Sequence, residues 1–363
     1  MTEQSFINQM EPWYGDEEIE AINNYLKEGG WLMEFKKTQE LEKIIANFVG
    51  SKYCSILPNG TISLFLALKA LNIGIGDEVI VPDYTMIATP NAVVWSGATP
   101  VFVDIDDSMC LDIERVRDAI TDRTRAVMHV SINGRAGELI NLKKLCEEKG
   151  LFLIEDAAQS LGSFFAGKHL GTYGHIGSFS FSVPKIITMG QGGALVTDDR
   201  HLYEKICKIK DFGRITSGVD IHDEMGWNFK YTDLQAVFGI EQMKKLDCRI
   251  IRKKEIAKLY HELLSGVVEV KFIPTNLDMV APWFFEILVP NPTELKEYLK
   301  TQNIGSRLFY PAVHTQKIYK WVKGDFPQAI DFAAHGLWLP SASQLANSQI
   351  EYVCARIIEF YHK

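Results

Sequence analysis

The feature that most constrains the fold is the regular alternation of short apolar runs with helical patterns over the first two-thirds of the chain. The apolar runs lie at residues 53–57, 78–81, 100–104, 125–130 and 151–156. Continuous apolar strands separated by helices are typical of a mostly parallel sheet covered on both faces. We therefore predict an α/β fold with a large, mostly parallel central sheet flanked by helices.

The alternation of continuous apolar runs with helical patterns ends after Gly177. Ser178–Val183 alternates with period two, and a glycine-rich turn at 190–193 precedes a further strand at 194–197. Helical patterns follow at 200–211, 231–246 and 247–265. The pattern of the remaining residues predicts, in order, two strands, a helix, a further strand and a terminal helix. At roughly 150 residues per domain, we predict a large domain over 1–246 and a smaller C-terminal α+β domain over 247–363.

Charge and hydropathy exclude several classes of protein. With 38 Lys+Arg against 46 Asp+Glu, the formal charge is −8, which argues against nucleic acid or an anionic membrane as the main partner. A small anionic ligand is still allowed, because it needs only local donors. No apolar stretch approaches the roughly 18 residues of a membrane span. The N-terminus lacks a basic region followed by an apolar run, so we expect no signal peptide.

Six cysteines are scattered along the chain, and none forms a CxxC pair. They indicate reduced thiols and a cytoplasmic location. We predict no metal site.

Ligands of open α/β sheets bind outside the carboxyl ends of the strands. After the first strand, Asn59-Gly60-Thr61 opens a helix, whose free N–H groups suit a phosphate. By itself this pattern also fits a plain helix cap. Asp156 ends the strand at 151–155, where a carboxylate either holds a positive charge on a ligand or serves as a cap or ion-pair partner.

Lys185 has apolar neighbours on both sides and no acidic residue nearby in sequence. Burial lowers the pKa of a lysine and frees the neutral amine for nucleophilic chemistry. A lysine, a carboxylate and a helix N-terminus together fit pyridoxal phosphate, whose aldehyde, ring nitrogen and phosphate they would bind. We therefore predict pyridoxal phosphate as the cofactor.

Short segments in a fixed order carry a resemblance that covers nearly the whole chain. They are Asn59–Leu64, Gly76–Pro82, Ala88–Ala92, Gly97–Asp104, Glu155–Ser160, Ser178–Phe181, Lys185, Gly192–Gly193, Gly226–Lys230 and Phe309–Pro311. With these segments the chain resembles the DegT/DnrJ-type nucleotide-sugar aminotransferases. The resemblance implies the aspartate-aminotransferase fold, known as fold type I, and dependence on pyridoxal phosphate.

The resemblance assigns the central chemistry to three residues. Lys185 is implied as the Schiff-base lysine, and Asp156 as the partner of the pyridinium nitrogen. Gln159 is implied to lie near the phenolic oxygen of the cofactor.

The phosphate site is implied in the same way. Ser180 and the helix start at Gly60, with the amides of Thr61 and Ile62, are implied to hold the phosphate. Asn228 resembles an asparagine that reaches the phosphate from the neighbouring subunit. That role implies a homodimer with shared active sites, although Asn228 alone also fits a turn residue.

Three positions depart from the family pattern. Met86 stands where an aromatic residue commonly stacks on the cofactor ring, and its thioether can pack on a ring face. Lys230 replaces the usual arginine, and Asn133 replaces an aromatic residue before Gly134. We expect these changes to bear on substrate choice and not on the cofactor chemistry.

Substrate contacts are implied by the segment 307–314. It resembles enzymes that aminate C4 of a 4-keto-6-deoxy sugar, so Arg307, Tyr310 and His314 are predicted to contact the nucleotide-linked sugar. Without the resemblance, the segment predicts only a strand and a turn. Relatives that remove a 3-hydroxyl carry histidine in place of the lysine, so Lys185 favours transamination.

The predicted reaction transfers an amino group from an amino acid, expected to be L-glutamate, to the C4 keto group of a nucleotide-linked 4-keto-6-deoxy sugar. Its product would serve surface glycans such as the lipopolysaccharide O-antigen, or natural products. The open alternatives are a dehydratase or lyase on the same sugars, an aminotransferase acting at C3, and a non-catalytic protein built on the same scaffold.

Overall fold

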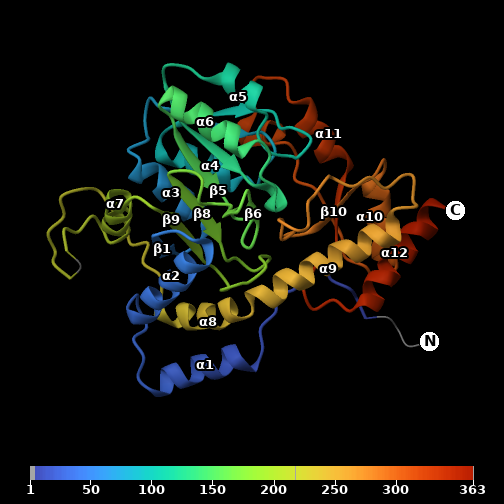
Figure 1. Ribbon diagram of the computed structural model, residues 1–363, viewed down its shortest axis with the longest axis horizontal. Coiled ribbons are helices and arrows are strands. Elements are labelled where there is room, and N and C mark those ends of the chain that lie inside the picture. The colour runs from blue at the N-terminus through green and yellow to red at the C-terminus, as the bar shows by residue number, and fades with distance from the viewer. Residues whose placement is uncertain (1–4, 217, 363) are drawn as a thin grey trace.

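The computed structural model describes residues 5–216 and 218–362, and it centres on a seven-stranded sheet (Figure 1). The strands follow the order β1-β9-β8-β5-β4-β2-β3. They span β1 (Tyr53–Leu57), β2 (Glu78–Pro82), β3 (Thr99–Val103), β4 (Thr124–Val130), β5 (Phe152–Asp156), β8 (Ile176–Ser180) and β9 (Gly193–Thr197). Only β9 pairs antiparallel to its neighbours. This sheet confirms the predicted α/β class.

Helices cover both faces of the sheet. The helices up to residue 264, not all of which lie on the sheet, are α1 (Asp16–Lys27), α2 (Lys36–Val49), α3 (Gly60–Ala70), α4 (Ala88–Ser96), α5 (Ile113–Ala119), α6 (Leu139–Lys149), α7 (Arg200–Lys210), α8 (Asp233–Lys244) and α9 (Leu246–Leu264). A short hairpin, β6 (Phe164–Phe165) with β7 (Lys168–His169), follows β5. The helices predicted at 139–149, 200–211, 231–246 and 247–265 are confirmed within two residues at each end.

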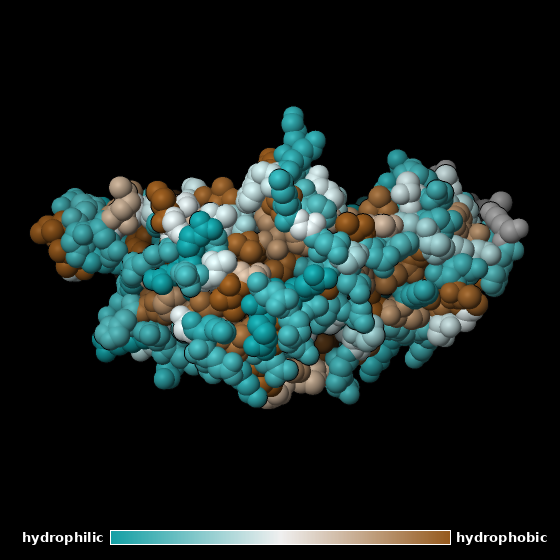
Figure 2. All heavy atoms as spheres, turned by 90° about the horizontal axis from the view of Figure 1, so that it is seen from above, coloured by the Kyte–Doolittle hydropathy of each residue, from teal (hydrophilic) through white to brown (hydrophobic). Residues whose placement is uncertain are grey.

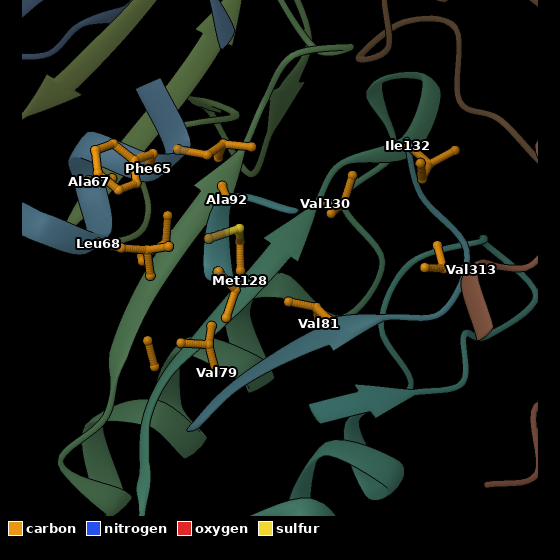
Figure 3. Close-up of a cluster of buried hydrophobic side chains, with 14 of the residues drawn as sticks. Phe65, Ala67, Leu68, Val79, Val81, Ala92, Met128, Val130, Ile132 and Val313 are labelled. Atoms are coloured by element: carbon orange, nitrogen blue, oxygen red, sulfur yellow. The ribbon is translucent and has the colours of Figure 1, made fainter. Parts of the chain in front are cut away.

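Strand β2 shows why the apolar runs are continuous. Val79 and Val81 join the core under α3 and α4, whereas Ile80 between them joins a separate core that includes Leu142 of α6. Because successive side chains point to opposite faces, a strand covered on both sides needs an apolar residue at every position. Figure 3 shows the first of these cores, with side chains from α3, α4, β2 and β4 meeting at Phe65, Leu68, Val79, Val81, Ala92, Met128 and Val130.

The C-terminal part forms a smaller antiparallel sheet, β10-β12-β11, with its own core. Its elements are β10 (Phe285–Leu288), α10 (Pro292–Thr301), β11 (Arg307–Leu308), α11 (Pro327–His335), β12 (Gly336–Leu339) and α12 (Asn347–Tyr361). Figure 1 shows α9 running from the central part to this unit. Within this unit, β10 is the one strand before α10, so the prediction of two strands there is wrong. The segment around Lys271, where the first of the two was predicted, makes only the isolated bridge Lys271–Leu288.

The start of the described chain joins the C-terminal unit. Ile7 is buried in the C-terminal core, and its N–H donates to the carbonyl of Asn303 at 2.8 Å. The predicted division of the chain at 246/247 stays a prediction. Across the part of the chain that the structure describes, no helix combines the length and the apolarity that crossing a bilayer requires.

Candidate active site

A cavity of about 550 Å³ lies at the carboxyl ends of β5 and β8. This is the edge at which open α/β sheets bind ligands. Eight of the predicted cofactor residues line this one cavity: Gly60, Thr61, Ile62, Met86, Asp156, Gln159, Ser180 and Lys185. The fold thus brings together residues that lie up to 125 positions apart in the sequence, as between Gly60 and Lys185.

Lys185 lies on the loop that follows β8. The period-two pattern predicts a strand to residue 183, but the strand ends at Ser180, and Pro184, which has no N–H to donate, lies on the loop. Lys185 Nζ lies 4.2 Å from the ring centroid of Trp283, whose Nε1 donates to the carbonyl of Pro184 at 2.5 Å. Burial lowers the pKa of Lys185 to about 8, although the charge of Asp156 raises it. More of the amine is therefore neutral near neutral pH than in an ordinary lysine.

Asp156 ends β5 and is buried. Its Oδ2 accepts from Thr89 Oγ1 at 2.7 Å, and its Oδ1 accepts from the Ala158 N–H at 3.2 Å. Burial raises the pKa of Asp156, whereas these hydrogen bonds and the charge of Lys185 lower it. A buried carboxylate that shares its cavity with a single lysine is suited to bind a protonated ring nitrogen.

The start of α3 approaches Ser180 closely. A Cβ placed on Gly60 would lie 3.1 Å from the Cβ of Ser180, so glycine allows the helix start and this hydroxyl to share one site. Asn59 caps the helix, and its side chain accepts from the Ile62 N–H at 2.9 Å. The Ile62 amide therefore already has an acceptor, and its predicted contact with a phosphate stays a prediction. The helix N-terminus and the Ser180 hydroxyl are chemically suited to bind an anion.

Gln159 is buried beside Asp156. Its Oε1 accepts from the backbone N–H of Asn133 at 2.8 Å. Of the two ends of the Gln159 amide, only the oxygen can accept this hydrogen bond. The NH₂ group therefore remains available to donate to a ligand.

The predicted substrate residues lie outside the lining of this cavity. The guanidinium of Arg307 packs over the rings of Tyr310 and Trp338, at 5.4 and 5.6 Å from their centroids. Burial raises the pKa of Tyr310 to about 12, the charge of Arg307 lowers it, and the charge of Asp156 raises it. Tyr310 therefore lies within electrostatic range of Asp156.

His314 is engaged by a buried carboxylate. Its Nδ1 lies 2.5 Å from Oδ2 of Asp83, and its backbone N–H donates to Oδ1 at 2.9 Å. Burial raises the pKa of Asp83, whereas its hydrogen bonds with His314 lower it.

Asn228 lies on the segment between α7 and α8, where it forms an isolated bridge with Asp211. It does not line the cavity of its own chain. The neighbouring Lys230 pairs with Asp211 at 2.7 Å, so this lysine keeps an ion pair inside its own chain.

Three residues that contact the predicted site residues in the structure, Thr89, Trp283 and Asn133, are not themselves predicted as site residues from the sequence. Thr89 lies in a segment that carries the resemblance, which could have identified it. Trp283 lies 98 positions after Lys185, and no sequence signal links the two. The sequence marks Asn133 only as a departure from the family pattern.

The residues of the cavity fit pyridoxal phosphate. A lysine of lowered pKa, a buried carboxylate and an anion site at a helix start face one space, and these groups match the aldehyde, the ring nitrogen and the phosphate. The fold and the site therefore define a pyridoxal-phosphate-dependent enzyme of fold type I.

Comparison with known proteins gives the family. The model of the DegT/DnrJ/EryC1/StrS aminotransferase family matches residues 12–358. GDP-perosamine synthase of Escherichia coli O157:H7 is 35% identical, with 98% of this chain and 99% of that protein covered. GDP-perosamine synthase of Vibrio cholerae is 33% identical, with 97% and 98% covered. The crystal structure of DesV from S. venezuelae in complex with a ketimine intermediate superposes with a TM-score of 0.91 at 30% identity, covering 96% of this chain and 95% of that one.

The chain belongs to the DegT/DnrJ/EryC1/StrS aminotransferase family. The family, the fold, the aminotransferase class and the cofactor predicted from the sequence are confirmed.

Proposed function

We propose that this aminotransferase moves an amino group from L-glutamate to the C4 keto group of a GDP-linked 4-keto-6-deoxy sugar. The observation that carries the proposal is the cavity in which Lys185, Asp156 and the start of α3 meet. The choice of nucleotide and of C4 is supported by two relatives named GDP-perosamine synthase, which align with nearly the whole chain. Glutamate leaves as 2-oxoglutarate, and the sugar gains the amine.

Lys185 is the proposed proton carrier. Pyridoxal phosphate, when bound, supplies a ring that accepts the electron pair left when the donor's α-proton is removed. The neutral amine of Lys185 removes that proton and returns it to the cofactor side, and it does the reverse when the sugar is aminated. A pKa of about 8 suits both directions, because the amine holds and releases protons near neutral pH.

Asp156 and the start of α3 hold the cofactor in this proposal. The Asp156 carboxylate binds the protonated ring nitrogen and so keeps the ring electron-poor. Ser180 and the amides of Gly60 and Thr61 bind the phosphate, and the NH₂ of Gln159 donates to the phenolic oxygen. Met86, 46% exposed at the cavity wall, packs on the ring face.

Arg307, Tyr310 and His314 are the proposed contacts of the sugar nucleotide. Arg307 is exposed, and a guanidinium suits a diphosphate. His314 is held by Asp83 through Nδ1, which leaves Nε2 for a substrate hydroxyl. These local donors would bind an anionic substrate despite the formal charge of −8.

A homodimer with shared sites completes the proposal. The segment between α7 and α8 projects from the body of the chain (Figure 1). It carries exposed Ile215, Val219, Ile221 and Met225, and Figure 2 shows hydrophobic surface at the end of the molecule where this segment lies. Exposed apolar groups gathered on a projecting segment favour burial against another chain. We propose that Asn228 reaches the phosphate site of the partner subunit, and that the enzyme acts in the cytoplasm.

One experiment tests the function. The purified holoenzyme is incubated with L-glutamate and a panel of GDP-, UDP- and dTDP-linked 4-keto-6-deoxy sugars and their 3-keto isomers. We expect a 4-amino sugar from the GDP substrate and one equivalent of 2-oxoglutarate. A deoxy-keto product without nitrogen, formed equally without glutamate, would show a dehydratase instead. Amination at C3, or preference for another nucleotide, would overturn that part of the proposal.

A further inference from the structure

Asn133 connects two sides of the active site that come from distant parts of the sequence. It lies in the 3-10 turn Ile132–Gly134 after β4, is 3% exposed, and has a φ of 50°. Asparagine tolerates this left-handed conformation better than most residues. Its backbone N–H binds Gln159, and its side chain binds the backbone of Phe284.

The Asn133 side chain forms two hydrogen bonds with the backbone of Phe284. Asn133 Nδ2 donates to the carbonyl of Phe284, and Asn133 Oδ1 accepts from the Phe284 N–H, both at 2.9 Å. Both partners are buried. An aromatic residue, which the family pattern commonly places here, cannot form hydrogen bonds with both the N–H and the carbonyl of one residue.

Trp283 directly precedes Phe284, whose backbone Asn133 holds by two hydrogen bonds. The Trp283 indole binds the Lys185 loop twice: its Nε1 donates to Pro184 O, and its ring face lies against Lys185 Nζ. A ring face at this distance stabilises an ammonium group by a cation–π interaction.

We propose that Asn133 is a positioning residue for the aminotransferase reaction, which turns the NH₂ of Gln159 toward the cofactor and holds the Trp283 indole against the Lys185 amine. The proposal rests on the proposed roles of Lys185 and Gln159. Asn133 itself touches neither the cofactor cavity nor Lys185 in the structure; it acts through the backbone of Phe284 and the amide of Gln159.

Other charged groups also face Lys185. Asp156 lies across the main cavity, and a small second cavity beside Lys185 is lined by Glu11, Arg249 and Lys253. The variants described below leave all four groups in place. A change in the titration of Lys185 among these variants therefore reports the position of the Trp283 ring.

The test measures the apparent pKa of Lys185 in the full-length chain freed of cofactor, from the pH dependence of the rate at which pyridoxal phosphate binds. Only the neutral amine reacts with the aldehyde. The variants are W283L, N133G and the double variant N133G/W283L. Glycine keeps the left-handed backbone and the N–H to Gln159 but removes the pair with Phe284. Asn72, an exposed asparagine with a φ of 59°, provides the matched control N72G.

We expect W283L to lower the apparent pKa by about half a unit, a threefold change in the ratio of neutral to charged amine, because the cation–π interaction is lost. N133G should lower it in the same direction, and the double variant should go no lower than W283L, since both act through one ring. N72G should match the wild type. A purely structural role for Asn133 would lower the melting temperature and leave this pKa in place.

Three outcomes would overturn the proposal: a wild-type pKa in folded N133G, additive shifts in the double variant, or no shift in W283L. If N133G does not fold, N133S replaces it, because the short serine hydroxyl cannot form both hydrogen bonds with Phe284 and adds no charge; a wild-type pKa in N133S would count against the proposal equally. No sugar takes part in the measurement. Failure to aminate any sugar would therefore overturn the proposed function and leave this result standing.

Discussion

Thr89 Oγ1 donates a hydrogen bond of 2.7 Å to Oδ2 of Asp156, and both side chains are buried. The same hydroxyl lies 2.9 Å from that of Thr85, which lines the cavity. Since burial alone would favour the neutral carboxyl, the Thr89 hydroxyl helps to keep Asp156 in the charged form that its proposed role at the ring nitrogen requires.

Thr89→Val should therefore weaken both cofactor binding and turnover. Valine fills nearly the same volume but cannot donate, and a hydrogen bond to a charged group contributes about 1.5–3 kcal/mol. We expect kcat/KM to fall roughly 10- to 100-fold. Thr89→Ser retains the hydroxyl and is the matched control. If valine and serine variants had the same kinetics, the hydroxyl would have no role at Asp156.

Asp156→Asn should remove the negative charge without changing the shape of the site. An amide cannot keep a ring nitrogen protonated, so kcat should drop by at least about 100-fold, the effect of losing one partner of a buried charged pair. Circular dichroism should show an intact fold. Activity within a few-fold of the wild type would argue against the role of Asp156.

Most of this site was predictable because its parts follow strand ends. Asp156, Lys185 and the helix start at Gly60 each lie next to an apolar run, and parallel topology brings such positions to one edge of the sheet. Trp283 was not predictable, because its contact with Lys185 depends on how the C-terminal part packs against the sheet. The pattern of hydrophobic residues carries no information on that packing.

Lys185 should be the site of covalent attachment. Borohydride treatment of the yellow holoenzyme should add the reduced cofactor to the peptide that contains Lys185, as detected by mass spectrometry. Lys185→Ala should lose both the label and the activity, while Lys258→Ala, an exposed lysine of α9, should keep both. A label on another lysine, or wild-type turnover by Lys185→Ala, would contradict the assignment.

Lys253 predicts a pH-dependent change in stability. It is 6% exposed, and burial lowers its pKa to about 7. Below that pH both the folded and the unfolded chain hold the proton, and the folded chain bears the full penalty of a buried charge. As pH rises from about 7 toward the ordinary lysine value, only the unfolded chain keeps the proton, so stability increases.

Lys253→Met should therefore stabilise the protein most below pH 7, by up to a few kcal/mol, and the gain should shrink as pH rises toward 10. Urea unfolding at pH 6 and pH 9 measures the difference. Lys258→Met, on the exposed face of the same helix, should show no such trend. A gain that is equal at both pH values would mean that Lys253 is neutral throughout or freely solvated.

The limits of sequence interpretation also appear in the smaller C-terminal sheet. Short strands such as β11, with two residues, carry too few positions to show a period, and the segment around Lys271 has strand-like residues but makes only one bridge. His314 is predicted as a substrate contact, and the sequence does not indicate that its Nδ1 contacts Asp83, 231 positions away. Such pairs follow from tertiary packing and leave no local pattern.

The proposed shared site predicts that two inactive chains restore activity when combined. Lys185→Ala removes the amine from one site, and Asn228→Ala removes the partner's phosphate contact. In a heterodimer of these two variants, one active site combines the native Lys185 of the Asn228→Ala chain with the native Asn228 of the Lys185→Ala chain, and the other site lacks both residues. Random assembly places one chain of each kind in half of the dimers, so about a quarter of the wild-type activity should return. Each variant alone, refolded in the same way, is the control. No recovery in verified heterodimers would show that Asn228 serves its own chain.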